Sequence, residues 1–260
     1  MLARVLAFAA LLVLSACEDA PPAPAPAAAQ GACESRSFEG SAFTVCPYDA
    51  RTDELRLVLS GADGKPLRSL AALQAALGAE AVRVSFAMNA GMYDEEGDPI
   101  GLYVEQGKPL ARLNLRSGPG NFHLLPNGVF AADADGSVSV TTSPAFAKRK
   151  AKPLWATQSG PMLVIGGKLH PKFDHDGPSQ LVRNGVGVKD SRTAYFVISD
   201  FGVSFGRFAR FFRDVLGCRD ALYLDGTVSS LWEPAAGRQD PYSSLGPMVV
   251  VLRKASAPRP

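Results

Sequence analysis

Short apolar segments, each bounded by turn-forming residues, recur along most of the chain and constrain its fold more than any other feature. Segments of this kind are typical of β-strands, because a helix of ordinary length needs a longer apolar pattern at intervals of three and four. The expected strands are 43–45, 55–59, 82–88, 101–104, 129–132, 138–142, 158–165, 194–199, 221–224 and 248–252.

Two segments instead have helical spacing. Residues 70–77 carry Ala and Leu and stop at Gly78, a residue that commonly follows a helix. Between Ser204 and Gly217, phenylalanines recur at three and four residues, with Ser204 as the expected N-cap. We expect this second helix to pack on a sheet rather than on a membrane surface. The sequence therefore predicts the α+β class, with one strand-rich domain, a mixed central sheet and a few packed helices.

The N-terminus indicates export. Residues 1–16 have the pattern of a signal peptide, and Leu14-Ser15-Ala16-Cys17 resembles the lipobox of bacterial lipoproteins. This resemblance implies lipidation of Cys17, the alternative being an ordinary secretory signal with an incidental cysteine. Residues 17–32 are rich in Pro and Ala and predict a tether before a domain at 33–260. The expected location is the bacterial cell envelope, facing the periplasm, with the outer membrane favoured over the inner and contact through the lipid anchor only.

Cysteine spacing and net charge indicate a disulfide and give no support for a cysteine metal site or for a nucleic-acid partner. Cys33 and Cys46 flank a predicted hairpin, so a disulfide between them is reasonable in an exported protein, and Cys218 is expected to be a small buried residue. No pair of cysteines has the spacing of a metal site. A formal net charge of +2 gives no argument for nucleic acid as a partner.

The strongest chemical signal lies at the end of the strand predicted at 221–224. Asp225 follows this buried segment, Gly226 permits backbone angles closed to other residues, and Ser229 and Ser230 supply hydroxyl and N–H groups for an anion. A carboxylate mounted on a buried strand is well placed for catalysis. The alternative is a structural Asp that satisfies a turn.

Three more predicted loops carry amides, glycines or an arginine, namely 89–91, 158–161 and 183–187. Amides suit hydroxyl-rich ligands and the Arg183 guanidinium suits a phosphate, so together with 225–230 they suggest a pocket for a sugar bearing an anion. Asp200 is the best second carboxylate, although a helix-entry turn explains it equally well. Asn121 and His123 are candidates for the pocket rim or for a turn. The candidate substrate-binding residues are Asn89, Gly91, Asn121, Gln158, Ser159, Gly160, Asn184, Gly187, Gly226, Thr227, Ser229 and Ser230.

Three motifs, in order, resemble those of the phosphodiester glycosidase family, which includes the mannose 6-phosphate uncovering enzyme. Asn89-Ala90-Gly91-Met92-Tyr93 is similar to the family's Asn-Gly-Gly-aromatic motif. Residues 183–187, Arg-Asn-Gly-Val-Gly, are similar to its Arg-Thr-Ala-Ile-Gly motif, and 224–230, Leu-Asp-Gly-Thr-Val-Ser-Ser, to its Leu-Asp-Gly-Gly-Gly-Ser-Ser signature. The departure with most consequence is Thr227-Val228, because two β-branched residues stand where the family has glycines.

The resemblance implies hydrolysis of a sugar-1-phosphodiester. Asp225 would be the central carboxylate, as nucleophile or as base for water, and a role as metal ligand is the rival assignment. Arg183 with Ser229 and Ser230 would hold the phosphate, and Asn89, Gln158 and Asn184 would orient sugar hydroxyls. The expected partner is a glycosylated phosphodiester substrate.

Two alternatives stay open. The sequence requires no cofactor, although it leaves room for a divalent cation such as Ca²⁺; His170, Asp174, His175 and Asp176 lie close in sequence but lack a recognised ligand pattern. The rival function is a non-catalytic envelope protein that binds glycans or glycolipids, which the altered Asp225 loop keeps open. A serine hydrolase built on Ser159 is disfavoured, because Gln-Ser-Gly-Pro is not a nucleophile elbow.

Overall fold

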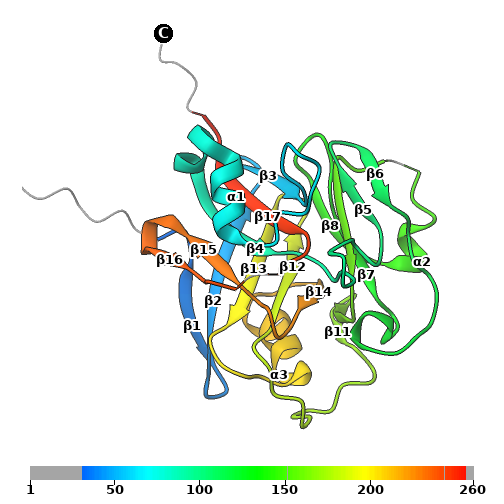
Figure 1. Ribbon diagram of the computed structural model, residues 1–260. Helices are drawn as coiled ribbons and strands as arrows, with labels where there is room; N and C mark the ends of the chain where they lie inside the picture. Colours follow the sequence, from blue (N-terminus) through cyan, green and yellow to red (C-terminus); the bar gives the residue numbers. More distant parts are fainter. Residues whose placement is uncertain (1–30, 151, 243, 256–260) are drawn as a thin grey trace, which may run out of the picture.

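The computed structural model describes residues 31–150, 152–242 and 244–255. Residues 1–30, which include the expected signal peptide, Cys17 and most of the tether, lie outside this description. Within it the chain is rich in strands, with three sheets and few helices, which confirms the α+β class (Figure 1).

The three sheets draw their strands from distant parts of the chain. In spatial order, the first contains β1 (Glu34–Phe38), β2 (Ser41–Asp49), β13 (Thr193–Ser199), β12 (Asn184–Asp190), β14 (Asp220–Asp225), β10 (Met162–Ile165) and β11 (Lys168–Leu169). The second contains β16 (Arg238–Gln239), β15 (Leu231–Glu233), β4 (Val84–Asn89), β17 (Met248–Arg253) and β3 (Asp53–Val58). The third contains β6 (Lys108–Ala111), β5 (Tyr103–Glu105), β9 (Trp155–Ser159), β7 (Gly128–Ala132) and β8 (Val138–Thr142).

The helices are short. They are α1 (Leu70–Leu77), α2 (Ser143–Phe146) and α3 (Phe205–Arg210), the 3₁₀ segments η1 (Gly78–Arg83), η2 (Asn121–His123) and η4 (Pro234–Ala236), and the π segment η3 (Phe211–Val215) that continues α3.

The expectation of a mixed sheet was wrong, because every strand pairing in the described part of the chain is antiparallel. The helix between β13 and β14 does connect two strands that run in the same direction, as a crossover helix would. These strands are not neighbours, however, since β12 lies between them and pairs antiparallel with both. The crossover therefore produces no parallel ladder.

The main core lies between the inner faces of the sheets. Phe196 and Leu222 of the first sheet meet Phe86 and Val251 of the second and Phe130 of the third in one buried cluster. The outer faces are covered separately: α1 packs on the second sheet, and α3 with η3 packs on the first, as Figure 1 shows. Alternate side chains of a strand therefore enter different cores.

Both predicted helices form for the expected local reasons. The Ser69 hydroxyl caps α1 by accepting from the Ala72 N–H at 3.1 Å, and the helix ends before Gly78, whose φ is +53°. In α3 the Ser204 hydroxyl accepts from the Arg207 N–H at 3.1 Å. Phe208, Phe211 and Phe212 of α3 and η3 are fully buried on the sheet and Phe205 is partly buried, which confirms the expected packing.

Several predicted boundaries needed correction. The strand expected at 158–165 is two strands, β9 and β10, which belong to different sheets and are separated by the cis Gly160–Pro161 peptide. Val82 is 90% exposed and lies in η1, so β4 begins after it. Residues 184–187 form the start of β12 rather than a loop. The Cys33–Cys46 disulfide is confirmed across the β1–β2 hairpin, and Cys218 is free and buried.

Candidate active site

Asp225, the last residue of β14, borders a pocket of about 560 Å³. Its side chain is half-buried, and each carboxylate oxygen accepts one hydrogen bond. Oδ1 accepts from the Gly226 N–H at 2.7 Å, and Oδ2 accepts from the Asn89 side-chain amide at 3.0 Å. Asn89 ends β4, so the carboxylate is held at the point where the first and second sheets meet.

The side chain of Asn89 can point its NH₂ group only toward Asp225. Its Oδ1 accepts from the Ser230 backbone N–H at 2.9 Å and from the Asn184 side-chain amide at 3.0 Å. A backbone N–H can only donate, so this contact fixes which end of the Asn89 amide is oxygen. Asn184 lies opposite Asp225 in the pairing of β12 with β14. The Ser229 hydroxyl donates to Oδ1 of Asn184 at 3.4 Å. We call Asn89, Asn184, Ser229 and Ser230 the amide cluster.

Burial raises the pKa of Asp225 to about 6, while the hydrogen bonds from Gly226 and Asn89 lower it in part. All of these donors are neutral, so they position the carboxylate without neutralising its charge. Burial, with the nearby charge of Asp225, also raises the pKa of Tyr93. A carboxyl group that exchanges its proton near neutral pH and faces a pocket is a candidate catalytic group.

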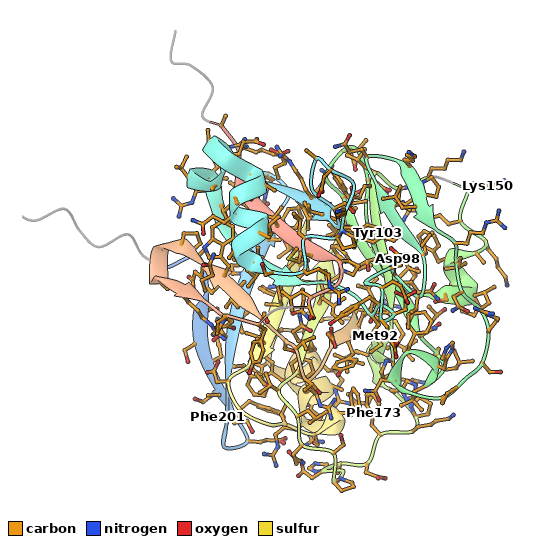
Figure 2. All side chains as sticks on the ribbon, viewed as in Figure 1. Met92, Asp98, Tyr103, Lys150, Phe173 and Phe201 are labelled. Atoms are coloured by element: carbon orange, nitrogen blue, oxygen red, sulfur yellow. A yellow bond between two sulfur atoms is a disulfide. The ribbon has the colours of Figure 1, made fainter. Side chains whose placement is uncertain are left out.

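The remaining pocket wall is largely aromatic and apolar. Its residues are Met92, Tyr93, Ile100, Pro119, Gly120, Asn121, Phe122, His123, Leu181, Tyr223, Gly226, Thr227 and Val228. Met92, labelled in Figure 2, and Ile100 close one turn, because the Ile100 N–H donates to the Met92 carbonyl at 3.2 Å. Asp225 is the sole carboxylate among these described lining residues.

Gly226 has a different reason to be glycine from the one predicted. Its φ is not positive, so the turn does not require special backbone angles. A Cβ at this position would instead lie 2.3 Å from the Tyr223 hydroxyl oxygen. Glycine therefore allows the tyrosine to approach the Asp225 turn. Thr227 and Val228 follow on the pocket wall, so their β-branched side chains shape the cavity itself.

Arg183 lies behind the pocket rather than on its wall. Its side chain is fully buried, with Nε donating to the Val203 carbonyl at 2.7 Å and Nη2 to the Ser179 carbonyl at 2.9 Å. The guanidinium stacks over the Phe205 ring at 3.7 Å, and Nη1 lies 3.5 Å from the Tyr223 hydroxyl. The direct phosphate contact expected from sequence is therefore not what this geometry offers: Arg183 reaches the pocket only through Tyr223.

Most of the other candidates have identifiable structural contacts. The Gln158 amide holds the Asn114 backbone by accepting from its N–H at 2.9 Å and donating to its carbonyl at 2.6 Å. The buried Ser159 hydroxyl donates to the Leu224 carbonyl at 2.8 Å. A Cβ at Gly91, Gly160 or Gly187 would lie within 2.7 Å of a neighbouring side chain, so close packing explains these glycines. None of the five lines the pocket.

Asp200 also lies away from the pocket. Its Oδ1 accepts from the Thr44 hydroxyl at 2.9 Å, and Arg238 Nη1 is 3.9 Å from the same oxygen. Of the sequence candidates, the pocket thus brings together Asp225, Asn121, His123, Gly226 and Thr227, with the amide cluster directly behind.

The sequence candidates omitted the two tyrosines of the pocket. Tyr93 stands at the end of the Asn89 motif, and Tyr223 stands two residues before Asp225. In a β-strand residues two apart share a face, so the position of Tyr223 was a usable signal. Asn121 and His123, from the Gly-Asn-Phe-His segment, both line the pocket.

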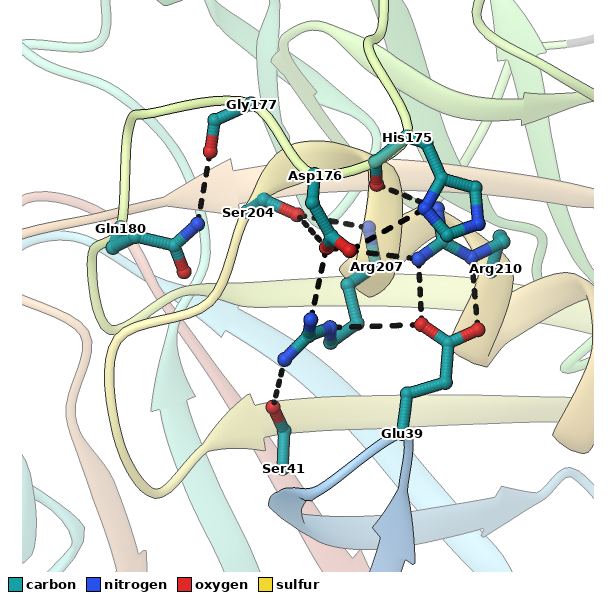
Figure 3. A network of polar contacts seen from close by, with 9 residues as sticks. All are labelled: Glu39, Ser41, His175, Asp176, Gly177, Gln180, Ser204, Arg207 and Arg210. Carbon is teal, nitrogen blue, oxygen red and sulfur yellow. Dashed lines mark hydrogen bonds and ion pairs between the residues drawn. The ribbon is translucent and has the colours of Figure 1, made fainter.

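Within the described residues, no group of three or more His, Cys, Asp or Glu side chains is placed to hold a metal ion. His170 is buried and stacks on Phe173, whereas Asp176 contacts Arg207 at 3.0 Å in a separate network (Figure 3). Across the same described part of the chain, no helix has the length and apolar character needed to cross a membrane.

Comparison with known proteins identifies the family of this chain. Residues 83–247 match the phosphodiester glycosidase family. The chain is 37% identical over 191 residues to the uncharacterized protein YigE of Escherichia coli K12, covering 74% of this chain and 73% of that protein.

Two solved structures share the fold. The zebrafish N-acetylglucosamine-1-phosphodiester α-N-acetylglucosaminidase catalytic domain, auto-inhibited by its pro-peptide, aligns with a TM-score of 0.57 and 15% identity over 86% of this chain and 82% of that chain. A hypothetical protein from Synechocystis aligns with a TM-score of 0.58 and 15% identity over 85% of this chain, which spans 61% of that longer chain. With its family match and its relative in E. coli, this chain belongs to the phosphodiester glycosidase family.

Proposed function

We propose that this protein hydrolyses a sugar-1-phosphodiester, releasing the free sugar and leaving a phosphate monoester on the other partner. One observation carries the proposal: Asp225 is the only carboxylate among the described residues of its pocket. An ordinary glycosidase uses two carboxylates, one of which protonates a poor leaving group. A phosphate monoester leaves as a stable anion, so one carboxylate is sufficient.

The reaction requires Asp225 in its ionised form. The carboxylate faces the anomeric carbon and either attacks it or removes a proton from the attacking water. If the carboxylate attacks, an ester bond between Asp225 and C1 replaces the bond between C1 and the phosphate oxygen, and water then displaces the carboxylate from C1. If it acts as a base, water attacks C1 directly. In both routes the electron pair of the C1–O bond leaves with the phosphate, and a water oxygen ends on C1. The proton released from water passes to solvent. The amide cluster holds Asp225 in position while positive charge develops at C1.

The pocket supplies the remaining interactions. Tyr93 offers aromatic surface for a sugar ring, and the side chains of Asn121 and His123 can hydrogen-bond hydroxyl or phosphate oxygens. Arg183 acts as a positioning residue by supporting Tyr223 from behind. We further propose that the domain works in the bacterial cell envelope, tethered through lipidated Cys17 and residues 17–32.

Turnover of methyl N-acetylglucosamine-1-phosphate, with free sugar as the readout, tests the proposal. We expect Asp225→Asn to lower kcat by about 10²–10⁴-fold, as for other groups that act directly on the reacting atoms. Because the pKa of Asp225 is raised to about 6, wild-type kcat/KM should fall as pH decreases through about 6. Asp220→Asn, at the other end of β14, is the matched control and should retain activity.

The rival function predicts a different result. A non-catalytic glycan-binding protein would bind the same phosphodiester without releasing sugar, and Asp225→Asn would then change affinity only. Wild-type turnover that survives in Asp225→Asn would show that another group performs the chemistry.

A further inference from the structure

A second hollow, of about 380 Å³, adjoins the active-site pocket and is bordered by Arg112 and Arg116. Ile100 lines both cavities, so they share a wall. A second link joins them, because Nδ1 of His123 lies 2.9 Å from the Arg116 carbonyl oxygen. A carbonyl can only accept, so Nδ1 carries the proton in this contact. The two cavities therefore lie side by side, with Ile100 between them.

The two arginines of this hollow are not used by the fold. Both are exposed, and neither forms an ion pair with any carboxylate that the structure describes. The two arginines form no ion pair even with the acidic turn 94–98, which directly precedes Pro99, another residue of the hollow. Two guanidinium groups at one cavity attract an anion, and their planar N–H groups suit phosphate oxygens.

The segment that carries these arginines is irregular but fixed. The buried Gln158 amide brackets the backbone of Asn114, as described above. The Asn114 side chain in turn donates to the Ile100 carbonyl at 2.8 Å and accepts from the Arg116 N–H at 3.1 Å. Buried amides thus hold the backbone between the two arginines, which reduces the entropy lost when a ligand binds.

We propose that this hollow is a subsite for a second phosphate, so that the preferred substrate carries a diphosphate, or a further phosphate, beyond the anomeric phosphodiester. The inference rests on the proposed function, since it assigns the part of the substrate that leaves. The sugar occupies the pocket at Asp225, and the leaving portion extends past Ile100 toward Arg112 and Arg116. The scissile bond and the chemistry stay the same.

Two substrates that differ by one phosphate test this inference: methyl N-acetylglucosamine-1-phosphate and methyl N-acetylglucosamine-1-diphosphate. We expect the wild-type protein to prefer the diphosphate. The double variant Arg112→Gln/Arg116→Gln should lose about 10-fold in kcat/KM on the diphosphate, because an exposed ion pair contributes roughly threefold. The loss should appear in KM, since the contact is the same before and during the reaction. Activity on the monophosphate should change less than about twofold by the same reasoning.

Arg219→Gln is the matched control. Arg219 is exposed, forms no ion pair with the described carboxylates and borders neither cavity. Raising the salt concentration should weaken the wild-type preference for the diphosphate, because salt screens exposed charges. A double variant that treats both substrates as the wild type does, or loses equally on both, would overturn the subsite.

Binding of inorganic pyrophosphate, followed by ³¹P NMR, separates this inference from the proposed function. If the wild type hydrolyses neither substrate, the proposed function fails and the titration alone decides the subsite. Pyrophosphate that binds the wild type and the Arg219→Gln control but not the double variant supports it. The same binding in all three proteins, or no binding in any, contradicts it.

Discussion

Two carboxylates of this protein are held by several donors, yet their environments have opposite effects. Glu39, in the turn between β1 and β2, receives two hydrogen bonds from the Arg210 guanidinium, at 3.0 and 2.5 Å (Figure 3). The hydrogen bond from Arg210 holds the pKa of Glu39 below its ordinary value. Asp225 receives its hydrogen bonds from a backbone N–H and a neutral amide, and burial raises its pKa to about 6.

The difference separates a structural carboxylate, Glu39, from Asp225, for which we propose a catalytic role. A guanidinium neutralises its partner, so Glu39 stays ionised and ties the β1–β2 hairpin to α3. Arg210 also donates to the His175 carbonyl at 2.6 Å, which adds a third segment to the same network. Neutral donors fix the position of Asp225 but leave its charge available for a substrate. Hydrogen bonds thus fix the positions of both carboxylates, but only the charge of Glu39 is compensated by a neighbouring cation.

Among the residues that support these two carboxylates, the largest effect is expected from removing the neutral amide of Asn89. Asn89→Ala removes the hydrogen bond that lowers the pKa of Asp225, so the acid limb of kcat/KM should move to higher pH. It also leaves the Ser230 N–H and the Asn184 amide without their acceptor. We expect kcat at pH 8 to fall by about 10–100-fold, because a loosely held catalytic group loses its productive geometry. A full pH–rate profile measures both changes.

The shift of the acid limb is the diagnostic part of that result. A variant that merely loosened the fold would lower kcat without moving the limb. Asn89→Asp is the informative second variant, because a like charge beside Asp225 should raise the limb further. An acid limb at the wild-type position in both variants would show that Asn89 does not act on Asp225.

An intermediate effect, on stability alone, is expected from the charged network. Arg210→Gln removes a nearly buried guanidinium and should lower the free energy of unfolding by about 1–3 kcal/mol at pH 7, toward the lower end because Glu39 remains partly exposed to solvent. The lowered pKa of Glu39 means that this contribution is present above its ordinary pKa of 4.5 and is lost as pH falls through the lower folded value. Urea unfolding at pH 7 and pH 3 measures both.

Arg36→Gln is the control on the same hairpin, since the Arg36–Glu34 pair is exposed and should contribute less than about 0.5 kcal/mol. Turnover of Arg210→Gln below its melting temperature should stay within about threefold of wild type, because the network lies outside the pocket. A change in turnover larger than the change in folded fraction would mean that the two networks are coupled.

The local parts of the fold were predictable from sequence, and the long-range parts were not. The strand before Asp225, the α1 helix and the cap at Ser204 depend on neighbouring residues, and the structure has them where the pattern predicts. The sequence pattern predicts a loop at the start of β12, because Gly185 and Gly187 are typical of turns. In the structure both glycines lie in a strand with no room for a Cβ. At Gly185 the Leu222 carbonyl oxygen blocks it, and at Gly187 the side chains of Phe212 and Cys218 do.

The candidate site was predictable to a similar degree. Asp225 and Asn89 were found because each ends a recognisable apolar strand. Their contact, however, joins two sheets through residues that lie 136 positions apart in the chain, and no local pattern reports that. Arg183 shows the limit most clearly: its residue type suggested a phosphate, whereas its burial against Phe205 and two carbonyl groups depends on how distant segments pack.

The smallest effect is expected at Asp200, the other carboxylate that the sequence suggested. It follows β13 and accepts from the Thr44 hydroxyl, outside the pocket that Asp225 borders. In Asp200→Asn the amide oxygen can still accept from Thr44, so we expect kcat to change less than about twofold. Steady-state turnover at pH 7 on the monophosphate substrate measures this. A loss as large as that of Asp225→Asn would mean that two carboxylates take part in the reaction. The proposal that phosphate, as a leaving group, needs no second carboxylate would then be wrong.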